Sequence, residues 1–116
     1  MTKNSRKLRW SDIYPGFPTE RAVRLLHGAP ANSRVSVYKH VPGEESHGRA
    51  RPGRCYVTAG SCIMRTPDEV VLREGDIMEF AGGDFSLKAD DESGVTCIWA
   101  WELPEEFRSE IGPGRE

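Results

Sequence analysis

Short strand-like segments, separated by glycine and proline at intervals of about eight to twelve residues, dominate this chain. In Arg34–Val41 (RVSVYKHV) three valines alternate with polar residues, as in a strand with one buried face. The run Val95–Leu103 (VTCIWAWEL) is rich in β-branched and aromatic residues and ends at Pro104. Regularly spaced short strands with turn residues between them are typical of antiparallel sandwiches and barrels. The sequence therefore predicts an all-β, antiparallel fold with almost no helix.

The same pattern predicts further strands in the middle of the chain, at Cys55–Ala59, Ser61–Arg65, Glu69–Leu72, Ile77–Phe80 and Phe85–Ala89. The N-terminal part is harder to interpret. Trp10–Pro18 holds two prolines and three aromatic residues, which favours an extended segment over a helix or a central strand. Glu20–His27 alternates in a way that suits a strand, and Glu105–Ile111 is expected to form one helical turn.

The chain has 116 residues, which favours a single domain. We expect a flexible basic arm at residues 1–9, a domain at residues 10–104 and a short tail at residues 105–116. No apolar run approaches the roughly 18 residues that a membrane span needs, and no apolar stretch follows the basic N-terminus as in a secretion signal. With only three, unevenly spaced cysteines, a disulfide framework is not expected, and a cytoplasmic location is predicted.

Charge is unevenly distributed along the chain. Residues 1–65 carry 12 Lys and Arg against 4 Asp and Glu, a balance of +8, whereas residues 66–116 carry 4 against 14, a balance of −10. In a single domain we expect the two halves to interleave and to compensate each other's charge. No basic run is interleaved with aromatic residues as in single-strand binders, so neither nucleic-acid binding nor membrane binding is predicted.

Two segments of this pattern resemble the motifs of small single-domain cupins, whose fold is a double-sheet jelly roll, or double-stranded β-helix. The first motif matches Pro42-Gly43, His47 and Tyr56–Gly60. The second matches Gly75-Asp76, the strand that follows it, and Gly83. The resemblance covers about residues 10–103 and implies a barrel with an internal pocket. It also implies a homodimer, in which paired subunits would cover exposed strand edges.

The positions that hold a metal ion in such barrels are mostly changed here. His47 occupies the first ligand position, but Arg49, Gly53 and Ser86 occupy the other three. Arginine has no lone pair to donate, glycine has no side chain, and a serine hydroxyl is a weak ligand for transition metals. The sequence therefore predicts no metal and no other cofactor. A rebuilt site that combines His47 with cysteines remains an alternative, as does burial of the three cysteines as small apolar residues.

Period-two alternation places His47 and Arg49 on one face of their strand, and Ser86 and Lys88 on one face of another. We expect these residues to converge with Cys55 on the barrel interior as an electropositive pocket for a small anionic metabolite. His47 would be the acid/base group of a metal-independent isomerase, epimerase or cyclase. The sequence leaves open whether the protein is an enzyme.

Two other functions remain open: a ligand-binding or sensor domain without catalysis, and a metal-dependent, oxygenase-like cupin with an atypical ligand set. The same residues also permit a purely structural interpretation. In that case His47 bonds to a backbone carbonyl, the arginines and Lys88 pair with acidic residues at the surface, and Trp99 and Trp101 belong to the core or to a dimer surface.

Overall fold

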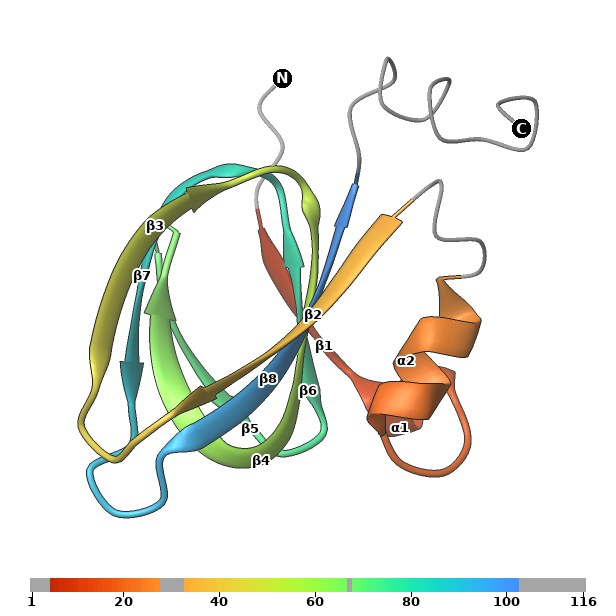
Figure 1. Ribbon diagram of the computed structural model, residues 1–116, viewed down its shortest axis with the longest axis horizontal. Helices are drawn as coiled ribbons and strands as arrows, with labels where there is room; N and C mark the ends of the chain where they lie inside the picture. The colour runs from red at the N-terminus through yellow and green to blue at the C-terminus, as the bar shows by residue number, and fades with distance from the viewer. Residues whose placement is uncertain (1–4, 28–32, 67, 103–116) are drawn as a thin grey trace.

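The computed structural model describes residues 5–27, 33–66 and 68–102, and they form an antiparallel β fold with two short N-terminal helices (Figure 1). The elements are β1 (Arg6–Arg9), α1 (Trp10–Ile13), α2 (Glu20–Leu26), β2 (Ser33–His40), β3 (Glu45–Ala50), β4 (Gly53–Arg65), β5 (Glu69–Arg73), β6 (Asp76–Phe80), β7 (Gly83–Ala89) and β8 (Val95–Glu102). The all-β prediction is confirmed. The predicted segment at 105–111 lies outside the described residues.

The long strand β4 joins two halves of the sheet. Its first part pairs with β6 and β8, and its second part pairs with β5 and β7. The register shifts between Val57 and Ala59, where the strand leaves one half for the other. Gly60 has a φ of 74°, and a Cβ atom there would collide with the carbonyl group of Gly94. The sequence predicted two strands separated by this glycine, but the glycine instead lets one bent strand continue.

The resulting halves face each other and enclose an apolar interior. One half has the strand order β1-β6-β4-β8-β2, and the other has the order β5-β4-β7-β3. Within the described residues β2 pairs only with β8 and β3 only with β7, so the sheet does not close into a barrel. The interior contains sulfur, aliphatic and aromatic side chains, including Cys55, Met64, Leu72, Met78, Phe80, Leu87, Cys97 and Trp99.

Both helices pack on the outside of the β6-β4-β8 region (Figure 1). Trp10 of α1 and Val23 of α2 form a second apolar cluster with Tyr56, Ile77 and Ile98. The prediction of a strand at Glu20–His27 is therefore wrong. The hydroxyl of the N-cap residue Thr19 accepts a hydrogen bond from the amide N–H of Ala22, and Arg24 pairs with Glu20 one turn earlier. These local contacts favour a helix over the apparent alternation.

Within the predicted flexible arm, Arg6–Arg9 form the strand β1 and pair with β6. Asp76, which is buried, explains this pairing. Its carboxylate lies 2.7 Å from Nη1 of Arg9 and 3.6 Å from Nζ of Lys7, and it also accepts the amide N–H of Arg73. A buried carboxylate needs such partners, and here the basic N-terminus provides them.

The basic and acidic parts of the chain interleave as expected. Ion pairs join Arg6 and Arg54 to Glu79, and Arg49 to Asp84, so cations of the first half meet carboxylates of the second. Among the described residues, none of the helices is long and apolar enough to span a membrane.

Candidate ligand pocket between β2 and β3

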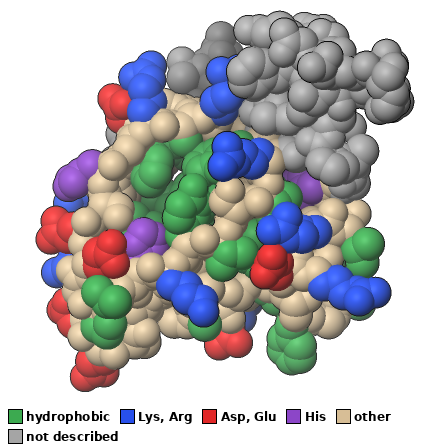
Figure 2. Space-filling model, in the orientation of Figure 1, with side chains coloured by type: hydrophobic (Ala, Val, Ile, Leu, Met, Phe, Trp, Pro, Cys, Tyr) green, Lys and Arg blue, Asp and Glu red, His purple; other side chains and the backbone are tan. Residues whose placement is uncertain are grey.

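β2 and β3 do not pair with each other, and the gap between them opens into a pocket of about 290 Å³. Figure 2 shows hydrophobic side chains inside a hollow on the face that Figure 1 presents. The two strands form the lips of the pocket, and β7 and β8 form its wall. The residues that line it are Tyr38, His40, Ser46, Gly48, Arg49, Phe85, Leu87, Trp99 and Trp101.

The wall of the pocket is an aromatic cluster. Trp99 and Trp101 lie two residues apart on β8, so both point to the same side of the sheet. Their rings are stacked, with centroids 4.4 Å apart and planes 9° from parallel. Phe85 of β7 lies 5.4 Å from the ring of Trp99, and Phe80 packs edge-on against both. These mutual contacts hold the rings in place. Trp99 itself is buried, whereas Phe85 and Trp101 are partly exposed, so these two rings offer aromatic surface to the pocket.

Gly48 on β3 keeps this surface accessible. It pairs with Phe85 across the sheet, and a Cβ atom at position 48 would come within 3.1 Å of the Phe85 ring. Any side chain at this position would therefore press on the aromatic wall or occupy the space in front of it. Ser46 and Ala50, which lie on the same face of β3, are also small. The lip formed by β3 thus leaves room that larger residues would fill.

Polar groups lie at the two ends of the pocket. His40 and Ser46 belong to the end where β2 and β3 are joined by the turn at residues 41–44. Arg49 lies toward the other end, where its guanidinium pairs with Asp84 at 3.2 Å and remains 78% exposed. Arg49 is thus a rim residue. Among the described lining residues it is the only lysine or arginine, so the interior is chiefly aromatic rather than electropositive.

His40 is the most unusual polar group of this pocket. Its side chain is only 13% exposed, and its buried Nδ1 has no hydrogen-bond partner within the described residues. The nearest acid is Glu44, whose Oε2 lies 3.5 Å from Nδ1. This separation allows an electrostatic contact but fails the geometry of a hydrogen bond. Buried polar atoms are nearly always satisfied, so an exception needs an explanation.

The predicted site residues do not converge in this pocket. His47, Ser86 and Lys88 lie on the opposite, outward-facing side of the β3-β7 half, where His47 pairs across the strands with Ser86. His47 and Lys88 are exposed, and Lys88 lies 3.9 Å from Asp91. Only Cys55 faces the interior, where it is fully buried and outside the lining of the pocket. The expectation of an inner electropositive site built from these residues is wrong.

The residue types along β3 indicate that the face with His47 and Arg49 is the outward one. Along β3 the charged or large residues Glu45, His47 and Arg49 are exposed, while the small residues between them are half-buried. A small-against-charged alternation predicts that the charged side faces water. In β2 the alternation is misleading, because its valines predict that the face opposite Tyr38 and His40 is buried, whereas the structure places both of these residues in the lining of the pocket.

The three cysteines lie in the interior. The contact with Cys97, followed by burial, raises the pKa of Cys62 above the ordinary thiol value. The contact with Cys55, followed by burial, raises the pKa of Cys97, although its contact with Cys62 acts in the opposite direction. Such thiols stay protonated and unreactive at neutral pH. His47, on the outer face, does not lie with any of them. Among the described residues, no group of three His, Cys, Asp or Glu side chains is placed to hold a metal ion.

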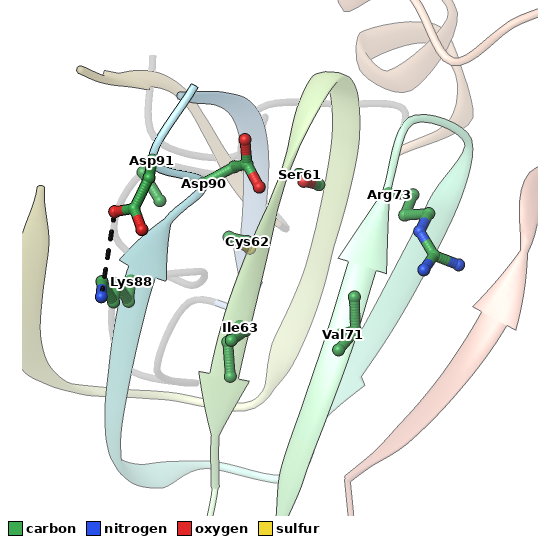
Figure 3. A pocket seen from close by; sticks show the side chains of 9 residues that line it. Ser61, Cys62, Ile63, Val71, Arg73, Lys88, Asp90 and Asp91 are labelled. Carbon is green, nitrogen blue, oxygen red and sulfur yellow. Dashed lines mark ion pairs between the residues drawn. The ribbon is translucent and has the colours of Figure 1, made fainter. Parts of the chain in front are cut away.

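The outer face of the β5-β4-β7-β3 half carries two shallow depressions. One, of about 230 Å³, lies beside His47, Arg65, Ser86 and Lys88. The other, of about 270 Å³, is shown in Figure 3, where Arg73 stands apart from the Lys88–Asp91 ion pair. The carboxylate of Asp90, which lines this depression, accepts hydrogen bonds from the amide N–H groups of Ser93 and Glu92. These two bonds, chiefly the one from Ser93, lower the pKa of Asp90. That carboxylate stabilises its turn, and both depressions are rimmed by charges of both signs.

Comparison with solved structures supports the fold. The chain is similar to the plu4264 protein from Photorhabdus luminescens, with 14% identity, a TM-score of 0.55, and coverage of 91% of this chain and 78% of the other. It is also similar to SPY1581, a conserved protein of unknown function from Streptococcus pyogenes, with 13% identity, a TM-score of 0.52, and coverage of 63% and 67%. No family model matches the sequence, and the search of curated proteins found no match. At these identities the likeness concerns the fold alone.

Proposed function

We propose that this protein is a small-molecule-binding domain of the cupin type, which holds a planar, largely apolar ligand in the pocket between β2 and β3. The observation that carries the proposal is the preformed aromatic wall of Phe85, Trp99 and Trp101 beside an open hollow. Ligand sites are typically apolar concave surfaces with a few polar groups that fix orientation. A flat ring could stack on this wall without first disturbing the core.

The proposal concerns binding and assigns no catalytic step. His47, the residue suggested for acid/base chemistry, lies on the outer face, and the anion-binding pair Arg49 and Lys88 is divided between the rim and that outer face. Arg49 remains available at the rim for a polar or acidic substituent of the ligand. The cupin jelly roll, homodimerisation and a cytoplasmic location stay predictions.

The test uses Gly48, because a side chain there should obstruct the pocket while leaving the fold intact. Gly48→Val places a branched side chain against Phe85. The control, His47→Val, introduces the same side chain at the adjacent position, which faces outward. Flat aromatic molecules such as indole and naphthalene are titrated into each protein, and the indole N–H resonances of Trp99 and Trp101 are followed by NMR.

We expect saturable shifts of these resonances in the native protein and in His47→Val. In Gly48→Val the affinity should fall by roughly tenfold or more, because the wall is obstructed. A ligand at a hundred times its Kd should also stabilise the native protein by about 2.7 kcal/mol. If neither molecule produces saturable shifts, or if both variants bind as the native protein does, the proposed pocket is wrong.

A further inference from the structure

We infer that Glu44 fixes the proton of His40 on Nδ1, and that His40 thereby selects planar ligands that carry an O–H or N–H donor. This inference rests on the proposed function, because it concerns the polar end of the same pocket. Among the residues that the structure describes, Nδ1 of His40 is buried without a hydrogen bond, and the carboxylate of Glu44 lies 3.5 Å away.

The carboxylate of Glu44 is held by the turn that joins β2 to β3. Its Oε1 accepts the amide N–H of Val41 at 3.0 Å, and its own amide N–H donates to the carbonyl of Val41 at the same distance. The carbonyl oxygen of Glu44 accepts the amide N–H of Ala89 at 2.8 Å. Three backbone contacts therefore fix Glu44, and Oε2 is the oxygen left to face the imidazole.

The negative charge of Oε2 decides where a neutral imidazole carries its proton. With the proton on Nδ1, an N–H dipole points toward the carboxylate; with the proton on Nε2, the lone pair of Nδ1 would face it instead. The first arrangement is attractive and the second is repulsive, and partial burial strengthens both. In a neutral imidazole one nitrogen donates and the other accepts. Nε2 is then an acceptor, and it is the ring nitrogen that remains for a molecule in the pocket.

This assignment defines the chemical class of the ligand. The body of the ligand is a flat ring that stacks on the partly exposed Phe85 or Trp101, and one end carries an O–H or N–H group that donates to Nε2 of His40. Phenols, indoles and N–H heterocycles fit this description. A flat molecule with only acceptor atoms leaves Nε2 desolvated and unpaired, which should weaken binding roughly tenfold to hundredfold.

Indole and benzofuran provide a shape-matched pair of probes, because the N–H of indole can only donate and the oxygen of benzofuran can only accept. Binding is measured by isothermal titration calorimetry at pH 8, with benzoate as an anionic third probe. The inference predicts that indole binds the native protein at least tenfold more tightly than benzofuran. Equal affinities would overturn it while leaving the pocket itself established. Tightest binding by benzoate that persists in Arg49→Gln would overturn it as well, because the carboxylate would then be held by a doubly protonated His40 rather than by the rim arginine.

Glu44→Gln tests the cause of this selectivity. The glutamine oxygen can still accept the amide N–H of Val41, so its NH₂ group turns toward Nδ1 and donates to it. The proton of His40 should then move to Nε2, and the preference for indole should disappear or reverse. Glu45→Gln removes the neighbouring charge on the outward-facing side of β3 and should leave the preference unchanged. Retained preference in Glu44→Gln would overturn the role of Glu44.

A measurement on the free protein keeps the inference testable even if a variant folds poorly. The ¹⁵N chemical shifts of the two imidazole nitrogens of His40 distinguish a protonated from an unprotonated nitrogen. We expect Nδ1 to be the protonated one in the native protein at pH 8. Protonation at Nε2 would contradict the inference without bearing on the pocket, whereas failure of all three probes to bind would remove the proposed function and the inference together.

Discussion

His27 and His40 occupy opposite sides of the same half of the sheet. His27 follows α2 on the outer side, where its Nε2 forms a 2.7 Å hydrogen bond with the hydroxyl of Tyr56 and its ring meets the Tyr56 ring edge-on. His40 ends β2 on the inner side and faces the pocket, and its buried Nδ1 has no hydrogen bond within the described residues.

The difference shows how a structural histidine can be told from one that is available to a ligand. The hydrogen bond of His27 is complete within the protein, next to Tyr56 and Arg54, so this ring ties the helical layer to the sheet. His40 has no such hydrogen bond within the described residues: its buried Nδ1 faces the carboxylate of Glu44, and Nε2 is the nitrogen left for a ligand. Neither residue stands out in the sequence, where the resemblance to the cupin motif singles out His47 instead.

The largest expected effect comes from the wall behind His40. Trp99→Ala should lower the free energy of unfolding by about 3–5 kcal/mol, because a buried indole is replaced by a cavity. Chemical denaturation measures this loss. Tyr38→Ala on the exposed lip is the control, since Tyr38 is 43% exposed and should cost much less. If Trp99→Ala lowers the free energy of unfolding only slightly, the pocket side is loosely packed, and the comparison of His40 with His27 fails.

Removing one hydroxyl should distinguish the two histidines directly. Tyr56→Phe deletes the partner of His27 and should destabilise the protein by about 1–3 kcal/mol, because the imidazole is left without its hydrogen bond. His40→Phe removes no hydrogen bond formed within the described residues and should change stability by less, although it abolishes the preference for donor ligands. A larger loss of stability for His40→Phe than for Tyr56→Phe would contradict the distinction.

Acid should weaken the His27 side. Burial, followed by the nearby charge of Arg54, lowers the pKa of His27 below its ordinary value of 6.5. The unfolded state then binds protons more readily than the folded state, so this contribution is full above pH 6.5 and is lost as the pH falls toward the lowered pKa. We expect the urea midpoint to decrease over this interval, and to decrease less in His27→Gln. An identical decrease in both proteins would refute this assignment.

His47→Ala should have the smallest effect. The side chain is exposed on the outer face of β3, so we expect a change in unfolding free energy within about 0.5 kcal/mol. Indole affinity should also match that of the native protein. A clear loss of binding on this substitution would restore the site inferred from the sequence and would weaken the assignment of His40.

The sequence predicted the strands well because alternation and turn residues are local signals. The predictions near the N-terminus were wrong where a few specific contacts decided the outcome: the cap at Thr19, the turn pair Glu20–Arg24, and the partners of Asp76. The site was missed for a different reason. The stacked wall and the His40–Glu44 contact depend on which strand faces are inward and on the absence of pairing between β2 and β3. Local sequence patterns do not reveal which strand edges remain without a neighbouring strand.

The two lips of the pocket are consecutive strands that pair with different neighbours, and the turn that joins them also carries Glu44. A bulky ligand that pushes β2 and β3 apart must bend this turn, and the bend moves the carboxylate of Glu44 relative to the imidazole of His40. The turn at residues 41–44 would therefore respond both to the size of a ligand and to its hydrogen-bonding groups. A larger ligand could thereby alter the preference for O–H or N–H donors that smaller ligands show.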